Sequence, residues 1–422
     1  MSVRVTTAGG EMRSDMPQAW VFNCDYNGLS VIQALGRRGV EVRALDSRRA
    51  IGTRSRYAQY CPVPDPMVDE DGFIQALWRY RGSVDANPVL IPTNDHWAET
   101  LARHQLDLAA GFECCVSGYE TVSLLLDKER FGRWGQSVGL PVPRVWSVDE
   151  ALANPNLPFP VAVKANSRRK SGQGVSWSRA ADRLRFRPCK DQAELEAVLG
   201  EARHAGVPVF LQEVINGRSD AMRTIGLFAR DGEILGLIFG EKHRGFPPRF
   251  GDCVVGIAMP APEWALGLVQ RACRELRYTG VAEFEVMVDS ESKERFLIEI
   301  NPRSWSWVGV TEPAGVPLAW LAFRNLAFGE GPEETQLGCP EGQSVYYAKL
   351  LADLQNTMLW YRFSDAKDWV FSPRGWWKTF SGRNGVFAEF ARDDPLVALM
   401  AFPQAAKLFA VRARHVLRGK RF

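Results

Sequence analysis

The sequence lacks the features of a secreted, membrane-spanning or nucleic-acid-binding protein. Its eight cysteines are scattered, with no CxxC pair and no zinc-like His/Cys spacing, which argues against disulfides and structural zinc. No uninterrupted apolar run approaches the roughly 18 residues that span a bilayer, and the first eighteen residues have no signal-peptide core. A net charge of +3 gives no electrostatic case for binding nucleic acid. We therefore expect a cytoplasmic protein.

Several catalytic motifs are also missing. No GxxxxGK[ST] sequence occurs, which excludes a Walker-type NTPase, and the five histidines form no convincing Ser-His-Asp or Cys-His arrangement. A dinucleotide fold would place GxGxxG after the first strand, but only Gly28 occupies that turn, although Asp46 stands about where the ribose-binding acid would be. A Rossmann-like scaffold without a dinucleotide is the preferred interpretation.

The 422 residues suggest two to four subdomains. Residues 1–18 resemble a disordered leader. Apolar runs at 19–24, 40–46, 88–93 and 112–117 alternate with helical patterns, which predicts a parallel α/β sheet over 19–123. A new unit begins at residue 124.

Farther along the chain, the pattern changes to antiparallel hairpins. We expect one hairpin around Asp231-Gly232 and another around the polar turn 289–294, with an amphipathic helix at 261–280 between them. From residue 331 the pattern weakens into a region rich in Trp, Phe and Arg.

The stretch "FLIEINPRSW" (296–305) carries polar residues at alternate positions of an apolar strand. Glu299, Asn301 and Arg303 should share one face. Glu285 lies on the preceding strand, and cross-strand neighbours approach within about 5 Å. Two carboxylates and an amide oxygen suit Mg²⁺, which we prefer to the alternative of a salt-bridged sheet face.

Two lysines stand in apolar surroundings, where an ammonium group needs an anion. Lys164 interrupts the strand 159–166, and Lys128 follows an apolar run. The loop 171–174 follows Lys164, and its glycines would let backbone N–H groups approach phosphate oxygens. Short glycine turns are common, so this loop is weak evidence on its own.

The motifs "LLDKERF", "PVAVKAN", "FLQEVINGRSD" and "FLIEINPRSW", in this order, resemble the ATP-grasp superfamily, in particular its predicted carboligases, or carboxylate–amine ligases. The resemblance covers about 19–330 and, more loosely, the tail to 396. It implies a Rossmann-like pre-ATP-grasp domain (19–123), a lid subdomain (124–215), an α+β core with the Mg²⁺ site (216–330) and a C-terminal extension with a basic tail (331–422).

The resemblance also implies the residues that bind nucleotide and metal. Glu285 and Glu299 would bind one Mg²⁺, and Glu299 with Asn301 a second, with Mn²⁺ as a substitute. The implied ATP-binding residues are the phosphate-binding Lys128 and Lys164, the lid residues Ser171, Gly172 and Gly174, the adenine-binding Gln212, Glu213, Val214 and Ile215, and the ribose-binding Asp220.

The catalytic set implied by the resemblance is Arg303, Lys242 and Arg244. Arg303 would contact the transferred phosphoryl group or the carboxylate that receives it. Lys242 and Arg244 lie in "EKHRGFPPRFG", which we interpret as a loop over the active site, with an ordinary solvated loop as the alternative. Candidate substrate contacts are Thr93, Asn94, Asp95 and His96, after the strand 88–93, and Arg249.

The implied activity is ATP-dependent, ADP-forming ligation of a small carboxylate to an amine through an acyl phosphate. An ATP-grasp phosphotransferase or carboxylase is the alternative enzyme, and a non-catalytic ATP-binding scaffold is the alternative of another class. The basic tail from Pro395 is expected to pack on its own domain, with contact to anionic lipid as the less favoured interpretation. A homodimer is left open.

Overall fold

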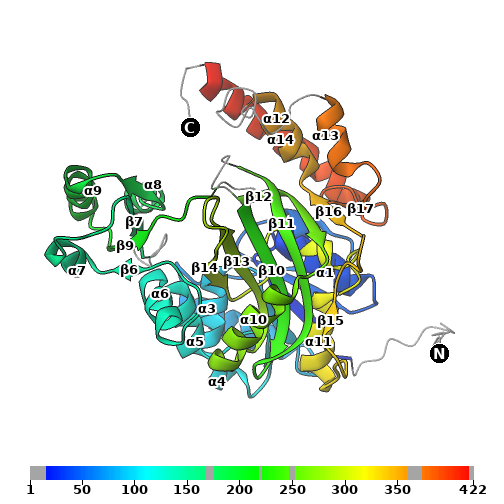
Figure 1. Cartoon of the computed structure of the whole chain (residues 1–422). Helices are drawn as coiled ribbons and strands as arrows, with labels where there is room; N and C mark the ends of the chain where they lie inside the picture. Colours follow the sequence, from blue (N-terminus) through cyan, green and yellow to red (C-terminus); the bar gives the residue numbers. More distant parts are fainter. Residues whose placement is uncertain (1–15, 167–174, 218–220, 247–251, 360–372, 418–422) are drawn as a thin grey trace, which may run out of the picture.

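Three β-sheets organise the chain in a computed structural model, which describes residues 16–166, 175–217, 221–246, 252–359 and 373–417. Within these ranges sheet A has five strands, sheet B four and sheet C eight. Figure 1 shows sheet B and its helices projecting to one side of the molecule, while helices α12, α13 and α14 gather at another corner.

Sheet A is parallel, as predicted. Its order is β3-β2-β1-β4-β5, and every neighbouring pair runs in the same direction. The unexpected strand is β3, an edge strand in which only Cys61 is buried, so its apolar signal is weak. The elements are β1 (Ala19–Phe22), α1 (Tyr26–Gly36), β2 (Val42–Asp46), η1 (Ile51–Arg54), β3 (Ala58–Pro62), α2 (Glu70–Arg81), β4 (Val89–Pro92), α3 (Asp95–Arg103), α4 (Gln105–Leu108) and β5 (Glu113–Cys114).

Sheet B is antiparallel, has the order β6-β9-β7-β8 and encloses a hydrophobic core of its own. Two helices, α5 (Tyr119–Leu126) and α6 (Lys128–Ser137), connect sheet A to it. The other elements are β6 (Val145–Trp146), α7 (Val148–Ala153), β7 (Val161–Ala165), α8 (Val175–Arg183), β8 (Arg187–Cys189), α9 (Gln192–Ala205) and β9 (Val209–Glu213).

Sheet C contains both predicted hairpins. Asp231 and Gly232 have positive φ angles of 49° and 88°, as a tight hairpin turn requires, and join β10 to β11. The prediction of a loop at "EKHRGF" (241–246) is wrong, because these residues form the last part of strand β11. The elements are β10 (Met222–Arg230), β11 (Glu233–Phe246), β12 (Asp252–Met259), the predicted helix α10 (Glu263–Leu276), β13 (Gly280–Val288) and β14 (Arg295–Asn301).

The region after residue 331 contributes strands to sheet C, whose order is β14-β13-β10-β11-β12-β16-β17, with β15 paired to β11. The pairing of β16 with β12 therefore joins this region to the sheet that carries the two hairpins. Before this region come η3 (Val308–Thr311) and α11 (Leu318–Phe328). Its own elements are β15 (Gln336–Leu337), β16 (Val345–Ala348), α12 (Leu350–Leu359), α13 (Pro373–Phe380), β17 (Asn384–Phe387) and α14 (Pro395–Leu417).

Two buried tryptophans pack against glycines on β10 and β12, the strands on either side of β11 in sheet C. Trp305 and Trp307 are fully buried and meet edge to face, with ring centroids 6.3 Å apart. A Cβ atom on Gly226 would lie 2.0 Å from the Trp305 ring, and one on Gly256 would lie 2.3 Å from the Trp307 ring. Glycine is therefore required for this close approach. Both tryptophans therefore belong to the packed hydrophobic core.

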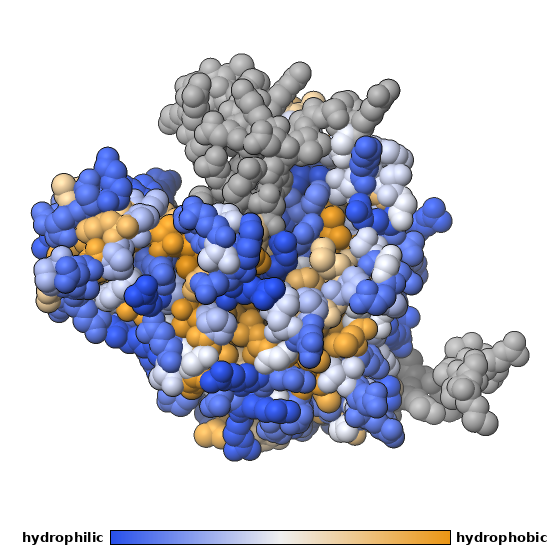
Figure 2. Space-filling view, in the orientation of Figure 1, coloured by the Kyte–Doolittle hydropathy of each residue, from blue (hydrophilic) through white to orange (hydrophobic). Residues whose placement is uncertain are grey.

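The face shown in Figure 2 is mostly hydrophilic, with apolar side chains exposed in scattered patches. Within the described part of the chain, no helix combines the length and apolarity needed to cross a membrane.

Candidate active site

The site is built on one face of the β13–β14 hairpin. The strand register pairs Glu285 with Glu299 and Glu283 with Asn301. Since residues two apart on a strand share a face, all four side chains lie on the same side of sheet C. The expected grouping of Glu285, Glu299 and Asn301 is therefore found, and a third carboxylate, Glu283, joins it.

A lysine pairs with each predicted metal-binding carboxylate. Lys128 Nζ contacts Glu299 Oε2, and Lys242 Nζ lies 2.6 Å from Glu285 Oε1. Lys128 is the first residue of α6, a helix that begins where the Asp127 side chain accepts a hydrogen bond from Arg130 N–H. Burial would lower the pKa of Lys242, but the charges of Glu285 and Glu283 raise it above the ordinary value. Lys242 therefore stays protonated.

Glu283 is the site residue that the sequence reasoning missed. It accepts a hydrogen bond from Asn301 Nδ2 at 3.1 Å, and Arg303 Nη1 lies 3.6 Å away. The side chain is almost fully buried, and burial together with the charge of Glu285 raises its pKa to about 7. Its position two residues before Glu285, in "AEFEV", was a usable signal.

Arg303 connects the metal-ligand face to the first unit of the chain. Its Nε donates to Asp95 Oδ1 at 2.8 Å, and its Nη2 donates to Asn301 Oδ1 at 3.1 Å. Asp95 is the first residue of α3, so a residue predicted for substrate and one predicted for catalysis are in direct contact. The first unit thus contributes a carboxylate to the site.

The other candidate substrate residues near Asp95 have local structural contacts. Thr93 Oγ1 donates to the carbonyl oxygens of Phe22 and Asn23 at 2.9 and 2.7 Å. Asn94 caps α3 by accepting a hydrogen bond from His96 N–H. Arg249 lies outside the described residues.

The predicted nucleotide-binding residues of sheet B occupy neighbouring strands. Lys164 on β7 donates from Nζ to Gln212 Oε1 on β9 at 2.8 Å, and both side chains are buried. Glu213 ends β9 and accepts a hydrogen bond from Arg144 N–H at 3.1 Å. Val214 and Ile215, both partly buried, follow directly. Ser171, Gly172, Gly174 and Asp220 lie outside the described residues.

Arg244 does not have the position expected of an active-site loop residue. Its guanidinium is only 1% exposed and makes two hydrogen bonds to the Asp353 carboxylate, at 2.8 and 2.7 Å. A third goes to Thr379 Oγ1 at 2.9 Å. The residue therefore joins β11 to α12 and α13, a correction to the catalytic role expected for it.

The donors on this face fit Mg²⁺ in chemical type. Glu285, Glu299 and Asn301 supply the oxygen atoms that this ion prefers, from paired positions on a rigid hairpin. In this structure the carboxylates contact lysines, and the Asn301 amide directs Oδ1 to Arg303. Across the described ranges, no group of three or more His, Cys, Asp or Glu residues is already arranged to hold a metal ion.

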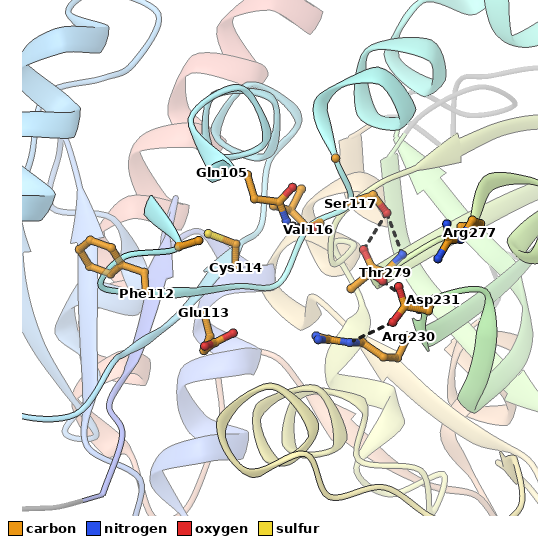
Figure 3. Close-up of a pocket in the computed structure, with 12 residues that line it drawn as sticks. Gln105, Phe112, Glu113, Cys114, Val116, Ser117, Arg230, Asp231, Arg277 and Thr279 are labelled. Atoms are coloured by element: carbon orange, nitrogen blue, oxygen red, sulfur yellow. Dashed lines mark hydrogen bonds and ion pairs between the residues drawn. The ribbon is translucent and has the colours of Figure 1, made fainter. Parts of the chain in front are cut away.

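A separate pocket of about 300 Å³ lies at the far end of β10. Its lining includes Arg230 and Asp231 at the end of β10, Thr279 just before β13, and Ser117 from the first unit (Figure 3). Thr224, the cross-strand partner of Glu285, is six positions before Arg230 on β10, or about 20 Å at the usual rise of a strand. None of the predicted site residues lines this pocket, so it is distinct from the face that carries the carboxylates.

Known proteins resemble this chain in sequence and in fold, although no protein-family model matches it. The D-aspartate ligase of Enterococcus faecium is 26% identical over 287 residues, which make up 65% of this chain and 66% of that protein. The chain thus matches slightly less than two thirds of this relative's length.

Among solved structures, the L-amino acid ligase of Bacillus licheniformis has a TM-score of 0.54 at 17% identity, covering 74% of this chain and 75% of its own. The N5-carboxyaminoimidazole synthetase of Staphylococcus aureus has a TM-score of 0.56 at 15% identity, covering 77% and 81%. The biotin carboxylase of Campylobacter jejuni has a TM-score of 0.55 at 17% identity, covering 76% and 73%. These comparisons confirm the resemblance predicted from the motifs: the chain has the fold of the ATP-grasp superfamily and is similar in sequence to one of its ligases.

Proposed function

We propose that the protein is an ATP-dependent, ADP-forming ligase that joins a small carboxylate to an amine. The main observation is the polar face of sheet C, where Glu285 and Glu299 are cross-strand partners and each contacts a lysine. Arg303 lies at the edge of this face and reaches the first unit through Asp95. Clustered charges of both signs fit a site in which several anions meet.

The proposed reaction has two steps. An oxygen of the substrate carboxylate attacks the γ-phosphorus of ATP, which forms an acyl phosphate and releases ADP. The amine nitrogen then attacks the acyl carbon, phosphate leaves, and the nitrogen loses a proton. In the first step two anions must approach, and unit charges 4 Å apart repel by about 4 kcal/mol at an effective dielectric of 20. Positive groups at fixed positions lower this barrier.

The residues of this chain would divide that work. Lys128, Lys164 and Lys242 would bind ATP phosphate oxygens, and Arg303 the transferred phosphoryl group or the substrate carboxylate. Glu285, Glu299 and Asn301 would hold Mg²⁺, which neutralises phosphate charge when bound. Two ions are expected, with Mn²⁺ as a substitute. Gln212 to Ile215, at the end of β9, would contact the adenine.

The comparisons support an amino acid as one of the two substrates. The relative and one of the solved structures are named D-aspartate ligase and L-amino acid ligase. The biotin carboxylase keeps carboxylation as the second candidate reaction. In both cases the first half-reaction would phosphorylate a carboxylate or bicarbonate, so the two candidates differ in the acceptor.

A trapping assay tests this function. The protein is incubated with MgATP, pools of carboxylic acids and amino acids, and hydroxylamine, which converts an acyl phosphate to a hydroxamate. We expect ADP, phosphate and a hydroxamate that depend on one carboxylate. Bicarbonate-dependent ADP release without a hydroxamate would instead indicate a carboxylase. A phosphorylated product that accumulates without free phosphate would indicate a phosphotransferase, and binding without turnover would indicate a scaffold.

Glu299→Ala tests the site itself. Loss of this carboxylate should reduce carboxylate-dependent ADP release at least 100-fold, because it is the residue proposed to hold both ions. The matched control is Glu291→Ala, on the exposed turn of the same hairpin, which should retain activity. Thermal unfolding of both variants checks the fold. A folded Glu299→Ala protein with near-normal turnover would refute the proposed metal site.

A further inference from the structure

Nearly half of the exposed large apolar side chains of the described residues lie on three C-terminal helices. Helix α12 contacts α14, and Figure 1 shows α13 beside them at one corner of the molecule. We call this group the C-terminal surface. It consists of Leu354 and Met358 on α12, Trp377 on α13, and Leu396, Leu399, Met400 and Phe402 on α14.

Helix α14 has two apolar faces, of which only one is covered. Val397 and Ala401 are buried, and they pack in a cluster with Leu29 of α1 and Ile51 of η1. Leu396, Leu399 and Met400, spaced i, i+3 and i+4, lie on another face and are 53%, 66% and 43% exposed. The expected packing of the tail on its own domain thus accounts for the first face and leaves the second in contact with solvent.

The sequence of this helix and of the five residues after it is strongly basic. From Pro395 to the last residue the sequence contains no Asp or Glu, while its basic residues are Lys407, Arg412, Arg414, Arg418, Lys420 and Arg421. Lys407 is exposed and lies eleven residues, or about three turns, beyond Leu396, which places it on the same face of α14.

The two acidic residues directly before α14 direct their side chains toward the first unit of the chain. Asp394 is fully buried and accepts hydrogen bonds from Gln33, Ser55 and the Arg56 N–H. Asp393 pairs with Arg37. These carboxylates are engaged by the first unit, so they do not offset the charge of Lys407 on the outward face of the helix.

We propose that the C-terminal surface docks on anionic lipid bilayers. Exposed apolar side chains next to a run of Lys and Arg are the combination that binds such interfaces, where the side chains enter the headgroup region and the basic residues meet the lipid charge. A purely apolar protein partner would bind the exposed apolar side chains without using the basic residues, whereas an anionic bilayer uses both. Sheet B lies on another side of the molecule, so docking leaves the proposed lid free (Figure 1).

Vesicle sedimentation of the full-length protein tests the proposal. The probes are vesicles of phosphatidylcholine alone and of phosphatidylcholine with about one third phosphatidylglycerol. We expect at least tenfold stronger binding to the second kind, weakened when salt is raised from about 0.05 to 0.5 M. Equal binding to both vesicles, or no binding to either, would overturn the proposal.

Two sets of variants distinguish binding through the C-terminal surface from nonspecific binding to vesicles. Leu399→Glu with Met400→Glu should reduce binding at least tenfold, and Lys407→Glu by a smaller factor. The matched control is Leu106→Glu with Val68→Glu, two exposed apolar residues of the first unit that should have no effect. If the Leu399/Met400 variant instead abolishes a concentration-dependent dimer, a second copy occupies the surface. If it unfolds at lower temperature, another part of the chain covers it, and either result overturns lipid docking.

Discussion

At the scale of single residues, the site is a cluster of charges of both signs. Lys242 pairs with Glu285, and Arg303 lies between Glu283 and Asp95, while the two neighbouring carboxylates Glu285 and Glu283 repel each other. Glu283 is the member with the least access to water, so its ionisation should depend most on its neighbours.

The raised pKa of Glu283 predicts a pH dependence of stability. Its pKa is about 7 in the folded protein and near 4.5 when unfolded, so between these values the folded state binds more protons. The ionisation of Glu283 should therefore lower the free energy of unfolding as pH rises from 4.5 through 7, by an amount on the order of 1–3 kcal/mol.

Urea unfolding of the wild type and Glu283→Gln, from about pH 5 to 8, measures this effect. The variant cannot ionise at this position, so its stability relative to the wild type should rise with pH. The exposed Glu291→Gln serves as the control and should follow the wild type. A constant difference between Glu283→Gln and wild type across this range would contradict the prediction.

At the scale of elements, a buried ion pair attaches the C-terminal helices to sheet C. Arg244 on β11 and Asp353 on α12 form two hydrogen bonds with both side chains inaccessible to water. Trp376 on α13 also donates to Asp353 Oδ2, at 2.8 Å. One carboxylate thus holds three elements together.

Asp353→Asn should leave the Arg244 charge without its counter-ion. We expect the free energy of unfolding to fall by about 3–5 kcal/mol, because an uncompensated buried charge is costly. Equilibrium unfolding in urea gives the value. The control is Glu201→Gln, which removes the half-exposed pair with Arg187 and should cost less than about 1 kcal/mol. Equal effects in the two variants would argue against a structural role for Arg244.

The elements also show how far sequence reasoning extends. Alternating polar residues predicted the shared face of Glu285, Glu299 and Asn301 because side-chain periodicity on a strand is local. The same periodicity places Glu283 on that face, although it was overlooked, but periodicity does not show how deeply a residue is buried and so could not predict the raised pKa of Glu283. The partner of Arg244 is 109 residues away, a distance at which periodicity carries no information.

At the scale of the whole molecule, the proposed nucleotide site uses residues from two sheets: Lys164 and Gln212 from sheet B, and the carboxylates from sheet C. A ligand that binds only the folded state stabilises it, by about 2.7 kcal/mol at a concentration 100 times Kd. Bound nucleotide should therefore raise the unfolding temperature of sheets B and C together.

MgADP should raise the melting temperature more than ADP with EDTA does, because the proposed site needs the ion to hold the phosphates. Lys164→Ala should reduce the shift, whereas the exposed Lys190→Ala should preserve it. Differential scanning fluorimetry measures all four conditions. An equal shift with EDTA would show that nucleotide binding does not use the carboxylate face.

The buried Asp394 has a consequence for biosynthesis. Gln33 and Ser55, near the start of the chain, bond to a carboxylate that lies 361 and 339 residues later. A ribosome adding 5–20 residues per second needs roughly 20–70 s to cover that interval. During that time the first unit exists without its last polar partners, and this surface is open to chaperones on every newly made molecule.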